Sequence, residues 1–73
     1  MRDKKLAALD AAIAEAERFL SAAKKARAGW HEYRYDGDGE TYLGFDSVSY
    51  AAAKRASMDL TRALAAFRRG EPR

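Results

Sequence analysis

Two stretches of the chain repeat one alternating spacing of apolar residues, and this spacing restricts the fold more than any other feature. In both stretches the successive steps are 3, 4, 3, 4 and 3 residues. Steps of this kind place apolar side chains in one row along a helix, as in a coiled coil. We call the rows the first seam (Leu6, Leu9, Ile13, Ala16, Leu20 and Ala23) and the second seam (Tyr50, Ala53, Ser57, Leu60, Leu64 and Phe67).

The first seam predicts a helix over residues 4–27. Asp3 is suited to cap its N-terminus, because a short acidic side chain accepts hydrogen bonds from the first free N–H groups. Cations gather in the last turn, where the helix dipole favours them, and Gly29 then ends the segment.

The second seam predicts a helix over residues 47–69. Either Asp46 or Ser47 can cap its N-terminus, and Gly70 follows its last turn. The chain is then one domain, with residues 70–73 as a flexible tail.

Two helices of nearly equal length favour an antiparallel pair, but a single pair of helices buries only one face of each. The chain has 73 residues and no cysteine, so neither disulfides nor thiolate zinc sites support a small core. We therefore predict a mainly α fold, an antiparallel two-helix hairpin that forms a four-helix homodimer. The residues predicted to form its core and dimer contact are Leu6, Leu9, Ile13, Leu20, Leu60, Leu64 and Phe67.

The connection between the helices spans roughly 18 residues, more than the 2–8 usual in a helix bundle. Its two aromatic segments flank "DGDG", whose residues tolerate the positive φ of a tight turn. A short β-hairpin is therefore expected over residues 30–45. A turn centred on Gly37-Asp38 pairs Tyr33 with Tyr42, whereas an Asp38-Gly39 turn pairs Tyr35 with Tyr42.

The same "DGDGE" resembles a calcium loop only at first sight. A twelve-residue frame that starts at Asp36 places Thr41 where glycine is needed and Ser47 where the bidentate acid belongs. We expect no metal and no cofactor.

Catalysis has no clear basis in the sequence. His31 and Glu32 are neighbours, and neighbours on a strand point to opposite faces. No glycine-rich loop has phosphate-binding spacing. We expect no catalytic residues and a protein that is not an enzyme.

The net charge of +3 is unevenly distributed. Residues 28–45 carry four acids and one arginine, a net −3, which leaves +6 for the remainder. A basic second helix could contact phosphates through Lys54, Arg55, Arg62 and Arg69, which makes a small nucleic-acid-binding protein the alternative function. Their spacing is read as placing Lys54, Arg62 and Arg69 on one side of the helix. Arg55 and Arg68 are read as lying away from that side.

A protein-interaction module is the better-supported function. Tyrosine and tryptophan contribute most contact energy at interfaces, and this chain concentrates them in its acidic insert. The predicted partner-binding residues are Trp30, Tyr33, Tyr35, Tyr42 and Phe45. Packing of Trp30 and Phe45 against the helices is an equally open role.

The segment "YAAAKRASMDLTRALAAFRRG", the small size and the missing cysteines resemble accessory proteins encoded by phages of high-GC bacteria. Some of these are helical hairpins that inhibit host proteins, including anti-CRISPR proteins and blockers of host regulators. The resemblance covers the second helix and the overall size. It implies an inhibitor that occludes a host protein in the cytoplasm, a compartment also compatible with a chain that has no cysteine and no apolar signal core.

Overall fold

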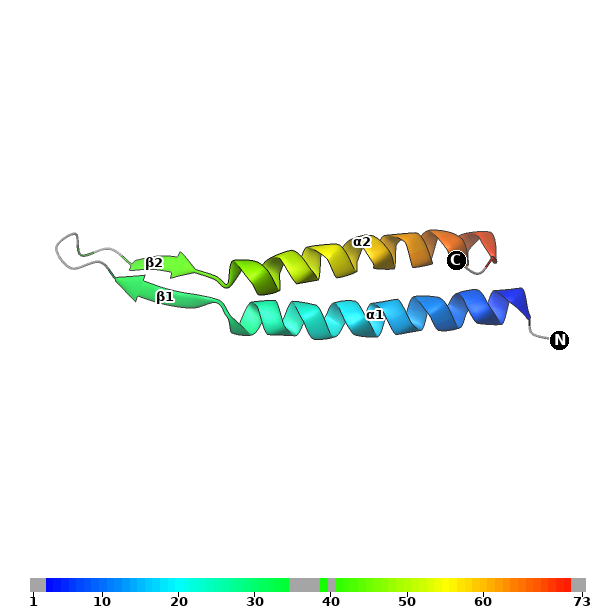
Figure 1. The fold of residues 1–73 in the computed structure, drawn as a ribbon, viewed down its shortest axis with the longest axis horizontal. Helices are drawn as coiled ribbons and strands as arrows, with labels where there is room; N and C mark the ends of the chain where they lie inside the picture. The colour runs from blue at the N-terminus through cyan, green and yellow to red at the C-terminus, as the bar shows by residue number, and fades with distance from the viewer. Residues whose placement is uncertain (1–2, 35–38, 40, 72–73) are drawn as a thin grey trace.

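The computed structural model describes residues 3–34, 39 and 41–71. It is mainly helical, with α1 (Lys4–Ala28) and α2 (Ser47–Arg69) side by side and antiparallel, and with a small antiparallel hairpin between them (Figure 1). The hairpin strands are β1 (His31–Arg34) and β2 (Thr41–Gly44), which continue the line of the helices away from both termini. The molecule is a rod of 67 × 15 × 14 Å.

The helix bounds agree with those predicted, to within one residue at the end of α1. Asp3 caps α1, and its Oδ1 accepts hydrogen bonds from the N–H groups of Lys5 at 2.7 Å and Leu6 at 3.3 Å. Gly29 ends α1 with φ −79°, an ordinary value for any residue. A Cβ there would lie 3.0 Å from the Cβ of Asp46, so glycine allows the end of α1 to approach the start of α2.

Asp46, and not Ser47, caps α2. Its carboxylate accepts the Val48 N–H at 3.1 Å and the Ser49 hydroxyl at 2.5 Å. At the other end Gly70 adopts φ 72°, and the N–H groups of Gly70 and Glu71 bond the carbonyls of Phe67 and Ala66. These two bonds form the usual glycine-terminated helix end. The predicted tail is partly outside the described residues, which stop at Glu71.

The contact between the helices consists of small side chains. Within the described part of the chain, the buried apolar residues are alanines: Ala8, Ala12, Ala26, Ala56, Ala63 and Ala66. Among the described residues no large side chain is fully buried. Small residues allow helix axes to lie close together, so the alanine row, and not the row of leucines, forms the inner contact.

Within one copy of the chain, the inner contact is not made by the residues predicted for the core and dimer contact, and their role in a dimer stays a prediction. Leu6, Leu9, Ile13 and Leu20 remain between 40% and 53% exposed, and Phe67 is similarly exposed, while Leu60 and Leu64 are half-buried. The prediction named the row of larger side chains as a combined core and dimer contact. The alanine row brings the backbones closer, and the leucine row lies at the side of the contact.

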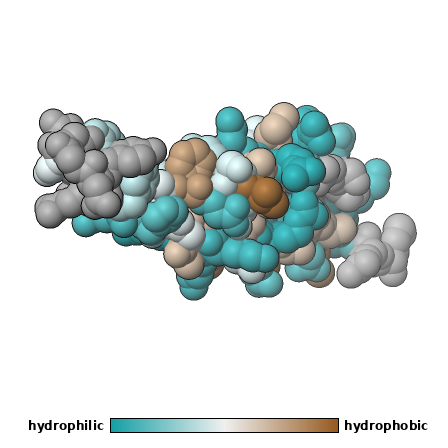
Figure 2. Space-filling model, turned by 60° about the vertical axis from the view of Figure 1, so that its left-hand side comes forward, coloured by the Kyte–Doolittle hydropathy of each residue, from teal (hydrophilic) through white to brown (hydrophobic). Residues whose placement is uncertain are grey.

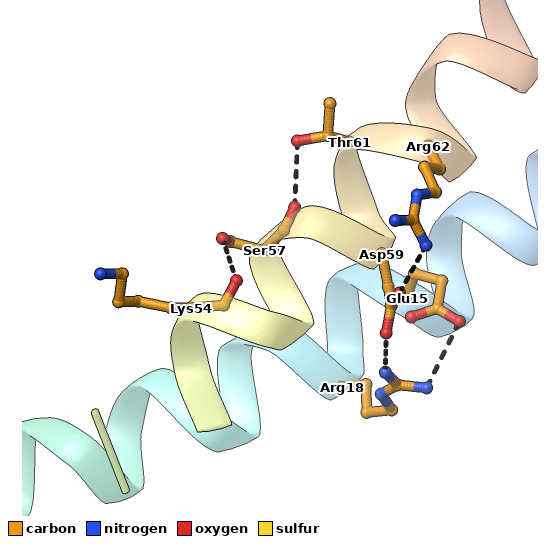
Figure 3. Close-up of polar contacts among 7 residues, drawn as sticks. All are labelled: Glu15, Arg18, Lys54, Ser57, Asp59, Thr61 and Arg62. Carbon is orange, nitrogen blue, oxygen red and sulfur yellow. Dashed lines mark hydrogen bonds and ion pairs between the residues drawn. The ribbon is translucent and has the colours of Figure 1, made fainter. Parts of the chain in front are cut away.

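One ion-pair network links the two helices at mid-length (Figure 3). Arg18 of α1 binds the carboxylate of Asp59 on α2 and also lies 3.5 Å from Glu15. Arg62 approaches the same Asp59 at 3.5 Å. The arginines are more than half exposed, so each pair contributes at most about 1 kcal/mol. Of these three pairs, the one between Arg18 and Asp59 joins the two helices and favours their register.

In the described part of the chain, no helix is long and apolar enough to cross a membrane.

We predict that Ala63→Leu destabilises the protein by about 1–3 kcal/mol, because a larger side chain must push the helices apart. Urea unfolding followed by circular dichroism measures the change. Ala51→Leu is the matched control, because Ala51 is exposed on the same helix. Equal stability of the two variants would contradict an alanine contact.

The second prediction concerns acid. The Ser49 hydroxyl, and after it the Val48 N–H, hold the pKa of Asp46 below its ordinary 3.8. The unfolded chain therefore takes up this proton at a higher pH than the folded chain. The resulting stability is present above the ordinary pKa and is lost as the pH falls through the lowered one.

Asp46→Ala should consequently lower the melting temperature at neutral pH, and the difference from wild type should shrink in acid below the ordinary pKa. Melting curves across this range measure the effect. Glu71→Ala, an exposed carboxylate at the opposite end of α2, is the control. A difference that is constant with pH would show that the charge of Asp46 does not stabilise the cap.

Candidate protein-interaction surface

The hairpin register decides which aromatic rings meet. β1 and β2 pair His31 with Gly44, Glu32 with Leu43, Tyr33 with Tyr42, and Arg34 with Thr41. This is the register predicted for a turn centred on Gly37-Asp38, and it excludes the pairing of Tyr35 with Tyr42. Tyr35 itself lies outside the described residues.

Three rings form a cluster where the hairpin meets the helices. Trp30 stacks on Phe45 with ring centroids 4.8 Å apart, and Tyr50 meets Phe45 edge-on at 5.2 Å. Tyr50 also lies 5.9 Å from Trp30. We call these three residues the aromatic cluster; each stays 36–46% exposed. The cluster therefore supports the junction and presents ring surface to solvent at the same time.

Two tyrosines form a separate surface on the hairpin. Tyr33 and Tyr42 stack with centroids 5.6 Å apart, and His31 lies on the same strand face, 6.1 Å from Tyr33. A Cβ at Gly44 would come within 2.7 Å of the His31 ring, so the glycine provides the space for the imidazole. We call this surface, made of His31, Tyr33, Tyr42 and Gly44, the tyrosine face.

The four described members of the predicted partner-binding set, Trp30, Tyr33, Tyr42 and Phe45, therefore lie on two surfaces. Alternate residues of a strand point to opposite faces, so the pair Trp30 and Phe45 lies across the hairpin from Tyr33 and Tyr42. Tyr50, which the prediction placed in the second seam and not in the binding surface, belongs with Trp30 and Phe45. The available signal was its position four residues after the helix cap Asp46. A side chain at that position often packs against the residue before the cap, which here is Phe45.

A shallow groove of about 350 Å³ runs from the aromatic cluster along the line between the helices. Alanines form its floor, and Arg27 and Lys54 lie at its rim, with the Lys54 Nζ 5.9 Å from the Tyr50 ring centroid. The Ser57 hydroxyl donates a hydrogen bond to the Lys54 carbonyl oxygen at 2.6 Å, so it adds little polar surface to the groove (Figure 3). The residues lining the groove are Phe19, Ala23, Ala26, Arg27, Trp30, Tyr50, Ala53, Lys54 and Ser57.

A second, open hollow of about 620 Å³ lies beside the hairpin, lined by Arg27, Trp30, His31, Glu32 and Leu43. Its lining mixes charged and apolar groups. The His31 Nδ1 lies 3.1 Å from the Gly29 carbonyl oxygen, a contact that orients the ring along the backbone. His31 and Glu32 are consecutive residues of β1, and both are exposed.

The nucleic-acid-binding candidates are divided between two sides of α2. Arg55, Arg62 and Arg69 are seven residues apart and share one side, which corrects the sequence-based assignment of Lys54 to that row. Lys54 lies over Tyr50 at the groove. Arg62 approaches Asp59, and Arg69 lies 3.8 Å from Glu71, so acids adjoin two of the three arginines.

Figure 2 shows one face of the rod from the hairpin end, where apolar side chains stand between hydrophilic ones. No group of three potential metal-binding side chains occurs within residues 3–34, 39 and 41–71. The acidic turn that resembles a calcium loop lies mostly outside this part of the chain. The arrangement of the described residues is suited to binding another molecule through rings, an apolar groove and a cationic rim.

No protein-family model, curated protein or solved structure matches the chain.

We predict that Phe45→Ala exposes Trp30 and shifts its fluorescence emission to the red. The stacked pair contributes about 0.5–1.5 kcal/mol beyond the area it buries, so the melting temperature should also fall. Trp30 is the one tryptophan of the chain, which makes the signal specific. Tyr33→Ala, on the opposite hairpin face, should leave the emission unchanged; a shift there instead would contradict the separation of the two surfaces.

Proposed function

We propose that the protein is a non-enzymatic protein-interaction module that binds another protein through its hairpin end and occludes the surface it covers. The observation that carries the proposal is the exposure of stacked rings on both faces of the hairpin and its junction. Trp30, Phe45 and Tyr33 each keep more than a third of their surface in water. Rings held in place and still exposed supply contact area at low cost in conformational entropy.

The position of the hairpin supports this proposal. β1 and β2 extend beyond the helices at the end of the rod opposite both termini (Figure 1). A partner can approach this end without meeting the helices. Leu43 and Val48, 64% and 74% exposed, add apolar surface close to the rings. An aromatic surface of this kind commonly lies at the centre of a protein interface.

Self-association is the second part of the proposal. The leucines of the first seam stay about half exposed in the single chain, and a chain of 73 residues with an alanine contact buries little apolar surface by itself. A homodimer of two helical hairpins, a four-helix assembly, covers such a row economically. The resemblance to phage accessory proteins suggests that the occluded partner is a protein of a bacterial host, bound in its cytoplasm.

The alternative function is nucleic-acid binding along α2. Arg55, Arg62 and Arg69 form an exposed row that suits phosphate contacts. The acids beside Arg62 and Arg69 weaken the positive potential of this row. The aromatic rings also lie at a distance from it, so they give no base-stacking platform next to the arginines.

We expect Tyr33→Ser to reduce partner recovery at least tenfold in affinity capture from lysates of GC-rich bacteria, with recovered proteins quantified by mass spectrometry. An aromatic residue at the centre of an interface contributes about 2 kcal/mol or more. Circular dichroism should show unchanged helix content, because Tyr33 belongs to β1 and not to a helix.

Met58→Ser is the matched control, since Met58 is 57% exposed on α2, away from the hairpin. A partner is assigned only to a protein that the Met58 variant retains and the Tyr33 variant loses. If both variants retain every captured protein, the tyrosine face is not the binding surface. Duplex DNA or RNA bound at micromolar affinity, with a steep decrease as salt rises, would support the alternative function instead.

A further inference from the structure

The groove and the exposed leucines of α1 lie at opposite ends of the same helix. Leu6, Leu9 and Ile13 occupy its N-terminal half and are 40–51% exposed. Ala23, Ala26 and the ring of Trp30, which follows the helix, form one wall of the groove at the other end. The exposed leucines at one end and a groove that includes Ala23, Ala26 and Ala53 at the other are complementary in shape.

The charged residues beside the first seam change sign along α1, from acidic near the exposed leucines to basic near the groove. Asp10, Glu17 and Lys24 are spaced seven residues apart, so they lie in one line beside the first seam. All three are exposed. The line is acidic beside Leu9 and Ile13 and basic beside the groove, where Arg27 and Lys54 add two further cations.

From these two observations we infer that the groove is filled by a second copy of this chain, whose α1 lies antiparallel across α1 of the first. Leu6, Leu9 and Ile13 of each copy lie against Trp30, Ala26 and Ala23 of the other. The twofold axis passes between Ala16 and Leu20, which again places a small residue opposite a large one. The inference deepens the self-association proposed above by assigning its surface and its direction.

Charge distinguishes this direction from the parallel one. Antiparallel pairing places Asp10 beside Lys24 of the other copy, and the twofold symmetry makes this contact twice. Parallel pairing places Asp10 beside Asp10 and Lys24 beside Lys24. The antiparallel dimer does bring the two Glu17 side chains near the axis, a single like-charge contact against two opposite-charge contacts.

The tyrosine face is not used by this dimer. The two hairpins lie at opposite ends of the assembly, because the helices that carry them run in opposite directions. Each Tyr33 and Tyr42 pair is then available to another protein. The dimer is a rod with one hairpin at each end, which allows two partners to be bound at once.

The test is a charge exchange measured by sedimentation equilibrium. Asp10→Lys alone and Lys24→Asp alone should each raise the dimer dissociation constant about three- to tenfold, since each creates two like-charge contacts. The double variant should return to within about twofold of wild type, because the pairs are restored with reversed sign. All three positions of the line are exposed, so circular dichroism should report unchanged helix content.

Disulfide cross-linking supplies a second readout, because the chain has no cysteine of its own. Ile13→Cys combined with Ala23→Cys should yield a covalent dimer on mild oxidation. Within one copy the two positions are about 15 Å apart along α1, too far for a disulfide. Ile13→Cys combined with Met58→Cys is the control and should stay uncross-linked, since Met58 lies on the far side of α2.

The outcomes separate the inference from the proposals on which it rests. A monomer at all concentrations overturns the inference and the proposed homodimer together. A dimer without charge rescue and without the Ile13–Ala23 cross-link overturns the antiparallel arrangement alone. Charge variants that keep the dimer but lose a captured protein would assign the groove to that protein. Whether the protein is a monomer or a dimer does not change the loss of partner that is expected for Tyr33→Ser.

Discussion

The close contact of two helices through alanine determines the rest of this structure. Ala8, Ala12, Ala56 and Ala63 allow the two backbones to approach, and little apolar area is removed from water in return. A contact of this kind leaves the larger side chains at its edges and not at its centre. The exposed leucines, the open groove and the partly exposed rings are all consequences of it.

The two ends of the rod are stabilised by different contacts. At the end that carries both termini, Asp3 caps α1 and the turn at Gly70 ends α2, each through hydrogen bonds donated by nearby backbone N–H groups. At the other end Asp46 and the close approach at Gly29 join helix to hairpin, and Trp30 stacks on Phe45 across that junction. The rings therefore stabilise the point from which the hairpin projects. The same rings stay accessible because nothing in the described part of the chain covers their outer faces.

The tyrosine face proposed for partner binding and the contact proposed for a second copy consist of different residues, whereas the exposed ring of Trp30 belongs to the proposed dimer contact. The tyrosine face lies on the hairpin, and the first seam lies along α1. A small chain separates these two surfaces because the strands alternate their side chains and because the hairpin extends beyond the helices (Figure 1). This separation is compatible with the proposed binding of a partner by the hairpin and with the proposed association of two copies along α1.

Much of this architecture follows from local sequence. Short-range hydrogen bonds and apolar spacing determine the helix bounds, the Asp3 cap, the glycine end at Gly70 and the presence of a hairpin. Both can be read from the sequence. Which of two adjacent rows meets the partner helix does not depend on spacing alone. The leucine row has the larger hydrophobic gain, but the alanine row permits the closer approach, and only the packed pair decides between them. The choice of Asp46 over Ser47 as cap depends on local backbone geometry, because its bonds reach only to Val48 and Ser49. The pairing of Tyr33 with Tyr42 and the stacking of Trp30 on Phe45 required the tertiary structure, because each joins the two arms of the hairpin.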